Sequence, residues 1–489
     1  MKVTSVVLAS GLIGALALLG ACGTSDTSAS NGGSSTTTTT SAGGGAGGTG
    51  GTDTGPPPWL GDAGLVVRPP VARPLHALCG IASNPGDMPL GQDPASVNLR
   101  KGYFDAALDL GGVMIRRDFR FDLIEPQPGL FAWTDTDALL DEAETRGVRI
   151  LGSMLYGTLW SNPDAKDIFW PPKPEDFQQY AGFTASRYKG RVVGWEIWNE
   201  PNGGFRFWKP TLSGDPVAYG TLLTAASDFI HQGDPEANVL LGGTVFTPQL
   251  IEGAMQWLGE AYAARPDLAA SFDTAGIHTY MSYPPRFPPE SFDDTDPPLA
   301  AKIQMHAWLL AQHGGESKEM WITEIGWPVA GNVGLAEQAS YTVRATIIAA
   351  REGAGGIFWY TLRDGPFPEA SPPEDAFGLL EYDPDPAAGN PPKPKPVYTA
   401  LKALLATVGD RWPKTAEEDT ERAAAPEGTQ VVTFHGDAPG EVYAAWRAEG
   451  QGTWSAPVAG ELIAQDGTSM GAVQKGAPIP LGPDVVYLR

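Results

Sequence analysis

The chain has 489 residues and is strongly acidic, with 33 Lys and Arg residues against 57 Asp and Glu residues and a formal net charge of −24 at pH 7. Because nucleic-acid binding requires a basic face, this balance argues against a nucleic-acid partner and, more weakly, against a polyanionic polymer. Only two cysteines occur, Cys22 and Cys79.

Residues 1–22 are predicted to be an export signal. One lysine precedes an apolar stretch from Val6 to Leu19, which is short for a membrane span. The segment that follows, Leu-Gly-Ala ending in Cys22, resembles the bacterial lipoprotein box, so Cys22 would be lipidated and become the first residue of the mature chain. The alternative is an ordinary secretory signal with a chance cysteine. We therefore expect a lipid-anchored protein of the bacterial cell envelope, periplasmic or at the cell surface.

Residues 23–57 are predicted to be a disordered linker, because they are almost wholly Gly, Ser, Thr and Ala and cannot bury a core. The remaining roughly 430 residues exceed the usual size of one core, so two domains are expected. If Cys22 is acylated, Cys79 has no disulfide partner. Its apolar neighbours, residues 77–81, predict a buried structural thiol.

Eight short runs rich in β-forming residues recur along residues 58–410 and alternate with segments that read as helices, such as Asp135 to Arg146 and Pro216 to Gln232. The runs are residues 76–82, 112–119, 148–155, 192–198, 238–244, 273–279, 319–325 and 354–361. Such alternation predicts a parallel sheet, and eight units predict a (β/α)8 TIM barrel. A doubly wound sheet is the alternative, but no Gly-x-Gly-x-x-Gly follows an early strand.

The barrel is expected to close in an apolar helix near Ala400 to Val408. Residues 411–489 change in composition: strand-like runs at 431–434, 442–446 and 485–488 are separated by Gly, Pro and Asp turns. They predict a small C-terminal β-sandwich, to which residues 63–71 would add a strand.

Two glutamates stand at the ends of the fourth and seventh predicted strands. Glu200 lies in Trp-Glu-Ile-Trp-Asn-Glu-Pro-Asn, and Glu324 lies in Trp-Ile-Thr-Glu-Ile-Gly-Trp. In a TIM barrel, catalytic groups sit at the carboxyl ends of the strands. Hydrolysis of a glycosidic bond with retention needs one carboxylic acid and one nucleophilic carboxylate about 5–5.5 Å apart. A solvated residue at the start of a loop is the alternative interpretation of each glutamate.

Both motifs resemble those of clan A of the glycoside hydrolases, which carry the acid/base in an Asn-Glu-Pro at the fourth strand and the nucleophile at the seventh. The resemblance implies that Glu200 is the acid/base and Glu324 the nucleophile of a retaining hydrolase. The sequence of the first motif and the C-terminal β-region look most like family 39, which contains β-xylosidases, α-iduronidases and exopolysaccharide endo-hydrolases. A family 5-like endoglucanase or mannanase is one alternative, and a non-catalytic glycan-binding lipoprotein is another.

The resemblance also assigns further residues to the site. Arg116 and Tyr280 would hold the nucleophile, although Arg116 paired only with Glu196 is the alternative. Asn199 would reach the sugar 2-hydroxyl, and Trp359 would lie under the reacting sugar, although a plain core position is equally compatible. His278 could be a core histidine or a substrate-binding one.

No metal or cofactor is expected, because the chain lacks His-Glu-x-x-His and paired Cys spacing and retaining chemistry needs neither. The expected partner is an oligo- or polysaccharide. The sequence names neither its sugar nor the oligomeric state of the protein.

Overall fold

The computed structural model describes residues 64–489, apart from residues 84–87, 90, 246–250, 283, 293–295 and 371–372, and without the side chains of Phe205 and residues 251–254. The chain divides into two units, Met1–Gly50 and Gly51–Arg489, and all described residues belong to the second. The predicted signal, Cys22 and the whole predicted linker precede residue 58 and lie outside the described residues. None of the described helices is long and apolar enough to cross a membrane.

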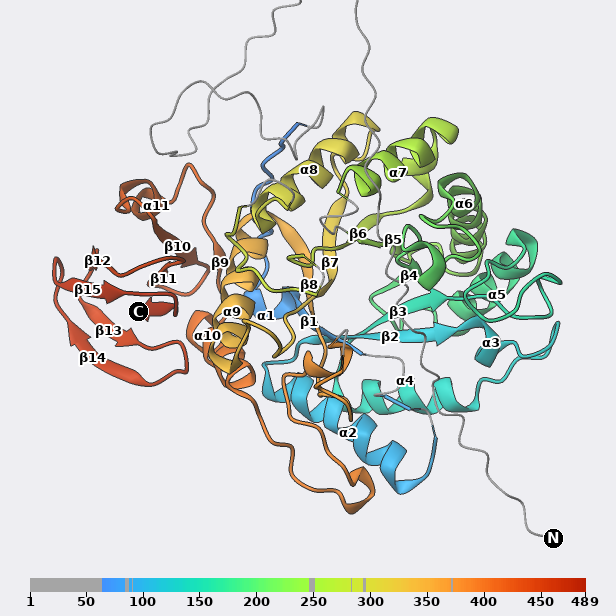
Figure 1. The fold of residues 1–489 in the computed structure, drawn as a ribbon, viewed down its shortest axis with the longest axis horizontal. Helices are drawn as coiled ribbons and strands as arrows, with labels where there is room; N and C mark the ends of the chain where they lie inside the picture. The colour runs from blue at the N-terminus through green and yellow to red at the C-terminus, as the bar shows by residue number, and fades with distance from the viewer. Residues whose placement is uncertain are drawn as a thin grey trace, which may run out of the picture. The chain divides into compact units, whose positions relative to one another are not determined.

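Eight parallel strands close into a barrel in the order β1 to β8 (Figure 1). They are β1 (Cys79–Ala82), β2 (Met114–Arg120), β3 (Ile150–Leu155), β4 (Gly194–Asn199), β5 (Val239–Val245), β6 (Thr274–His278), β7 (Glu319–Ile325) and β8 (Ala354–Tyr360). The predicted TIM barrel is therefore confirmed. The first predicted strand was too long at its start, because residues after Pro74 form the short helix α1 (Leu75–Leu78).

Helices surround the barrel strands (Figure 1). The longer ones are α2 (Pro94–Asp109), α4 (Thr134–Arg146), α5 (Pro174–Arg187), α6 (Pro216–Gly233), α7 (Ile251–Ala264), α8 (Leu299–Gln312), α9 (Leu335–Arg351) and α10 (Pro396–Val408), and the short α3 (Phe121–Ile124) follows β2. Local sequence sets their ends. Asp93 and Asp215 each cap a helix that begins with proline, because the carboxylate accepts the free backbone N–H groups and proline has none.

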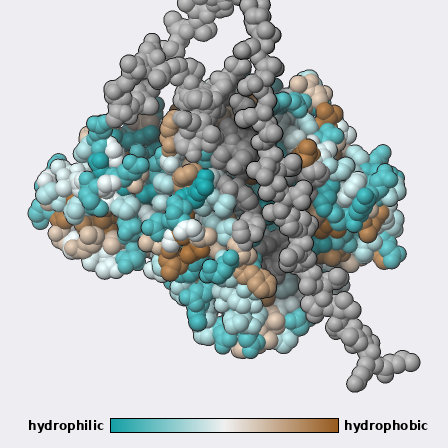
Figure 2. Space-filling view, viewed as in Figure 1, coloured by the Kyte–Doolittle hydropathy of each residue, from teal (hydrophilic) through white to brown (hydrophobic). Residues whose placement is uncertain are grey.

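The apolar residues form one core inside the barrel and a larger one between the strands and the helices. The inner core consists of Ala82, Met114, Leu151, Leu240, Trp321 and Phe358. Cys79 belongs to the larger core, where burial raises the pKa of its thiol and leaves it unpaired, as expected of a structural cysteine. The visible surface is mostly hydrophilic, with small separated apolar groups (Figure 2).

The C-terminal part forms two antiparallel sheets. The larger has the order β14-β13-β16-β11-β10-β9, and the smaller pairs β12 with β15. The bounds are β9 (Trp412–Pro413), β10 (Thr429–His435), β11 (Val442–Arg447), β12 (Gly452–Ser455), β13 (Gly460–Ile463), β14 (Ser469–Val473), β15 (Pro478–Leu481) and β16 (Val486–Leu488), with α11 (Thr420–Ala424) between β9 and β10. Both sheets contribute to one apolar cluster, so the predicted β-sandwich is confirmed.

Residues 64–71 do not add the strand that the sequence suggested. The backbone N–H of Val66 instead donates to the carbonyl of Gln304 on α8. Proline at positions 69 and 70 removes two ladder donors from this segment, which explains why it does not continue a sheet.

Glu290, in the loop between β6 and α8, joins the barrel to the C-terminal sheets. Its carboxylate accepts a hydrogen bond of 2.7 Å from the indole N–H of Trp446 on β11 and pairs at 3.0 Å with Arg344 on α9. Trp446 and Arg344 are fully buried. The C-terminal part therefore fixes a loop that follows a barrel strand.

Candidate active site

Arg116, near the middle of β2, is the centre of a buried ionic network. Its Nε donates to Glu196 at 2.5 Å, Nη1 donates to Glu324 at 2.7 Å, and Nη2 donates to the Asn199 amide oxygen at 2.9 Å. The sequence left open whether Arg116 holds Glu324 or pairs only with Glu196. In the structure, Arg116 contacts both. Arg116 is only 2% exposed, so these bonds are shielded from water.

Glu196 is fully buried and supplies the second half of this network. The Ser153 hydroxyl donates to it at 2.9 Å and the backbone N–H of Gly243 at 3.1 Å. Burial raises the pKa of Glu196, but the charges of Arg116 and His278 outweigh burial, and its pKa lies below the usual value of 4.5. Glu196 is therefore an ionised carboxylate that neutralises Arg116.

Arg116 also orients Asn199. Because the Asn199 oxygen accepts from the guanidinium, the amide NH2 is left to point elsewhere. This amide orientation is assigned from its hydrogen-bond partner. Asn199 is thus prepared to donate to an acceptor on a ligand.

Glu200 directly follows β4 with a left-handed backbone, φ 44°, and Trp198 before it has φ 75°. Such conformations are unfavourable for residues other than glycine, and they concentrate at functional sites. Asn202 fixes the turn: its amide donates to the Val245 carbonyl at 3.1 Å and its oxygen accepts from the Val245 N–H at 3.0 Å. The Asn-Glu-Pro-Asn motif therefore holds Glu200 against the end of β5.

Glu324, near the end of β7, is held by two donors. Arg116 donates to Oε1, and the Tyr280 hydroxyl donates to Oε2 at 2.8 Å. Lys302 on α8 in turn donates to the Tyr280 carbonyl at 2.6 Å and pairs with Asp296. A carboxylate that accepts from a guanidinium and a phenol is fixed in orientation.

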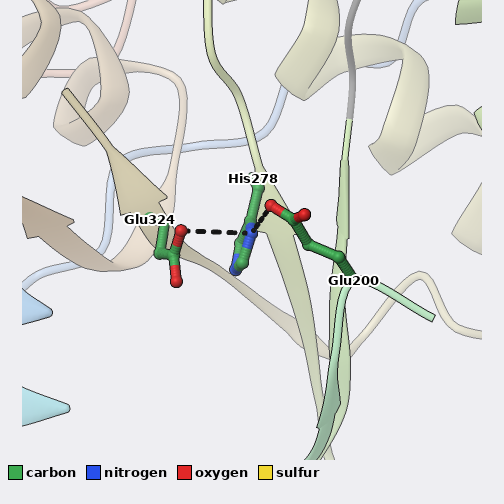
Figure 3. A group of neighbouring side chains, drawn as sticks. All are labelled: Glu200, His278 and Glu324. Atoms are coloured by element: carbon green, nitrogen blue, oxygen red, sulfur yellow. Dashed lines mark hydrogen bonds and ion pairs between the residues drawn. The ribbon is translucent and has the colours of Figure 1, made fainter. Parts of the chain in front are cut away.

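His278 lies between the two glutamates (Figure 3). Its Nδ1 is 2.9 Å from Glu200 Oε1 and 3.6 Å from Glu324 Oε2. Burial lowers the pKa of His278, but Glu324 and Glu200 outweigh burial, and its pKa lies above the usual value of 6.5. His278 thus links the two glutamates through one ring nitrogen. A Cβ at Gly243 would come within 2.2 Å of His278 Nε2, so only glycine leaves room for this ring.

Trp359 does not reach the site, and its sequence-based placement under a sugar is corrected. Its side chain is 1% exposed and its indole N–H donates to Thr346 on α9, outside the barrel. Phe358 lies in the inner core with Tyr360 packed against it, because alternate residues of a strand face the same side. Tyr360 is partly exposed and packs on Phe377 at 5.4 Å. Tyr360 is therefore the aromatic residue that β8 offers to the mouth of the barrel.

Four aromatic residues that follow barrel strands, Tyr156, Trp160, Trp208 and Trp327, are mostly structural. Trp208 and Trp327 are each 1% exposed and packed in the core, and Trp160 donates its indole N–H to the Glu125 carbonyl. Tyr156 differs, because the charges of Glu324 and Glu200 contribute to its environment and its backbone is left-handed with φ 69°. Of these four residues, Tyr156 is the one on which the charges of the glutamates act, and its ring packs on Phe169 and Trp198.

Glu200, His278 and Glu324 could also hold a metal ion, since one ligand atom from each lies within 4.8 Å of the others. Nδ1 is, however, occupied by Glu200, and both Glu324 oxygens accept hydrogen bonds. The same atoms thus already make hydrogen bonds to one another, to Arg116 and to Tyr280.

Comparison with solved structures gives the same fold. A family 39 glycoside hydrolase from the gut symbiont Bacteroides cellulosilyticus WH2 is 22% identical, with a TM-score of 0.66 over 86% of this chain and 82% of that chain. A monomeric beta-xylosidase from Caulobacter crescentus CB15 is 16% identical, with a TM-score of 0.57 over 86% of this chain and 97% of that chain. At this level of identity the likeness establishes the fold.

Sequence similarity is more limited. Endo-1,4-beta-xylanase C of Phanerodontia chrysosporium is 25% identical over 183 residues, which are 35% of this chain and 44% of that protein. The chain thus spans less than half the length of this curated relative. No family model matches the sequence. The comparisons and the barrel together place the chain among proteins with the fold of clan A glycoside hydrolases.

Proposed function

We propose that this protein is a retaining glycoside hydrolase that cleaves O-glycosidic bonds of a plant-type or exopolysaccharide glycan by double displacement. The observation that carries the proposal is the pair Glu200 and Glu324, which have carboxylate oxygens within 4.8 Å of each other at the ends of β4 and β7. Retaining enzymes bring their carboxyl groups to about 5–5.5 Å, whereas inverting enzymes separate them by about 6.5–9.5 Å to admit a water. The short separation favours direct attack.

In the first step, Glu324 attacks the anomeric carbon, and the bond from that carbon to the leaving oxygen breaks. Glu200 gives its proton to the leaving oxygen, so the aglycone departs as a neutral alcohol. Arg116 and Tyr280 hold Glu324 in place for the attack. The Asn199 NH2 donates to the sugar 2-hydroxyl, a contact that strengthens as the oxocarbenium-like transition state forms.

In the second step, Glu200 acts as a base. It takes a proton from water, whose oxygen attacks the anomeric carbon and releases Glu324. The adjacent His278 balances the charge of Glu200 as it loses and regains the proton. Two inversions at one carbon give net retention.

The names of the compared proteins support this class of substrate. They include a family 39 glycoside hydrolase, a beta-xylosidase and an endo-1,4-beta-xylanase. Xylan and aryl xylosides are therefore the first substrates to test. A family 5-like endoglucanase or mannanase uses the same pair of carboxylates and is the alternative that a polysaccharide panel separates.

Two substitutions test the assigned roles. Glu324→Gln removes the nucleophile, so activity should be lost on every substrate. Glu200→Ala should still form the glycosyl-enzyme from a dinitrophenyl glycoside, whose leaving group needs no acid, and azide should restore its turnover by forming a glycosyl azide. Glu319→Gln, at the opposite end of β7, is the matched control and should keep full activity. Full activity of either site variant, or lack of azide rescue, would contradict the roles.

The lipid anchor is part of the same proposal. A lipidated Cys22 followed by the Gly/Ser/Thr-rich linker would hold the barrel near the envelope surface while leaving it free to reach a polymer. Cys22→Ser should release the protein from the membrane fraction and keep its activity. Membrane retention of that variant would refute the anchor.

A further inference from the structure

Asp118 is a buried carboxylate at the mouth of the barrel that the two-step scheme does not use. It lies two residues after Arg116 on β2, so the two side chains face the same side of the strand. Its neighbour on β3 is Ser153, whose hydroxyl donates to Glu196. Asp118 therefore faces the inside of the barrel, directly above the ionic network.

No described donor reaches Oδ2 of Asp118, although the residue is only 8% exposed and this oxygen is buried. A buried acceptor without a hydrogen bond costs about 1–3 kcal/mol, more when it is charged. Arg116 does not supply the bond: its Nε, Nη1 and Nη2 donate to Glu196, Glu324 and Asn199, and none of them donates to Oδ2 of Asp118. The free protein thus leaves one carboxylate oxygen without a partner.

The charges around Asp118 place it in the same space as the glutamate pair. Burial raises the pKa of Asp118, Arg117 and Arg116 lower it, and Glu324 raises it again, with a net result above the usual value of 3.8. Burial also raises the pKa of Tyr156, to which Asp118, Glu324 and Glu200 contribute further. Asp118 and Tyr156 are therefore near enough to the two glutamates for their charges to interact.

A donor from outside the protein is needed to complete this site. The sugar that Glu324 attacks occupies this space in the proposed mechanism, and its hydroxyl groups are neutral donors that a carboxylate accepts well. A carboxylate substituent on the sugar would instead lie near three acidic side chains, those of Asp118, Glu200 and Glu324. Of the described cations, Arg116 is paired as described, Arg120 pairs with Asp122 and Lys302 with Asp296, and the charge of Arg117 acts on Asp118 itself.

We propose that Asp118 is a specificity-determining residue that accepts hydrogen bonds from hydroxyl groups of the sugar attacked by Glu324 and excludes a uronic acid from that position. The inference rests on the proposed function. It selects neutral sugars, such as xylose or glucose, from the range of glycosides that the fold could serve.

The test compares wild type with Asp118→Asn and Asp118→Ala on 4-nitrophenyl β-D-xyloside, β-D-glucoside and β-D-glucuronide, and on the matching α-glycosides. Wild type should cleave neutral glycosides at least 100-fold faster than uronides in kcat/KM. Asp118→Ala should lower kcat/KM on the best neutral substrate by roughly 10- to 100-fold, as expected for one hydrogen bond to a charged group. Asp118→Asn should lower the ratio of kcat/KM on neutral glycosides to kcat/KM on uronides.

A stability measurement separates recognition from a structural role. Because Oδ2 of Asp118 lacks a hydrogen bond in the free protein, Asp118→Asn should melt at or above the wild-type temperature. Asp122→Asn is the matched control: it removes the same charge four residues away, where Asp122 pairs with Arg120, and should keep the wild-type substrate ratio.

The outcomes are distinguishable. If wild type cleaves no glycoside or polysaccharide, the proposed function fails and this inference fails with it. If wild type is active but both Asp118 variants stay within twofold on neutral substrates, or wild type prefers a uronide, the inference alone is overturned. A lower melting temperature of Asp118→Asn together with an unchanged substrate ratio would show that Asp118 is structural.

Discussion

Replacing Arg116 by lysine should show how much the ionic network contributes to the stability and the activity of the protein. Lysine keeps the positive charge, but its three N–H donors lie on one nitrogen, whereas the guanidinium reaches Glu196, Glu324 and Asn199 from three different nitrogens. Each hydrogen bond that involves a charged group contributes about 1.5–3 kcal/mol, so losing two should lower the free energy of unfolding by about 3–6 kcal/mol. Loss of the bonds to Glu324 and Asn199 should lower kcat/KM at least roughly 100-fold.

The direction in which Arg116→Lys changes the pH dependence of stability follows from the pKa of Glu196. The pKa of Glu196 lies below its unfolded value, so its ionisation stabilises the folded protein above about pH 4.5, and this stability is lost as pH falls through the folded pKa. Arg116 is the largest favourable cause of that shift. In Arg116→Lys the loss should therefore begin at a higher pH, and acid unfolding should have a higher midpoint.

Urea unfolding at pH 7 and acid unfolding followed by tryptophan fluorescence measure both effects. Arg120→Lys is the matched control, because Arg120 lies on the same strand and forms a bidentate pair with Asp122, but the two side chains are 26% and 21% exposed. It should cost at most about 1 kcal/mol. An Arg116→Lys variant as stable and as active as this control would refute the assignment of Arg116 as the centre of the site.

Three further predictions follow from the described contacts. Trp446→Phe removes the indole N–H that donates to Glu290 and should lower the free energy of unfolding by about 1.5–3 kcal/mol in urea, and no change would contradict that junction. Tyr360→Ala should lower kcat/KM at least about tenfold whereas Trp359→Phe should change it less than twofold, and the reverse ranking would refute the correction. EDTA should leave the rate within about twofold and added Zn²⁺ should inhibit, so a loss restored only by a divalent ion would contradict the mechanism.

The strands and the two glutamates could be predicted because their signals are local. Each strand is an apolar run ended by turn residues, and seven of the eight begin and end within about two residues of their predicted limits. Glu200 and Glu324 follow motifs that end such runs. The residues between motifs carry no comparable local signal.

It was harder to predict which side chains at the end of a strand point into the barrel. On β8, the motif resemblance favoured Trp359, but the alternation places Phe358 and Tyr360 inside. On β4, strict alternation from Glu196 would turn Trp198 inward, yet its left-handed backbone turns its indole outward to the Phe207 carbonyl. Register shifts between β7 and β8 break the same rule, so the side that a residue faces depends on neighbouring strands.

The shared use of Arg116 also needed the three-dimensional structure. Its three acceptors come from β4 and β7, which approach β2 only when the barrel closes. The missing partner of Asp118 is likewise visible only once the donors around it are assigned. Such features depend on packing between distant strands, which spacing within one strand does not encode.

The stereochemistry of the first product tests the central claim most directly. ¹H NMR of the reaction mixture during the first minutes, on the best substrate from the panel, reports the anomer released before mutarotation. The assignment of Glu324 as nucleophile and Glu200 as acid/base predicts the same anomeric configuration in product and substrate. Release of the opposite anomer would contradict double displacement, even if both glutamate variants were inactive.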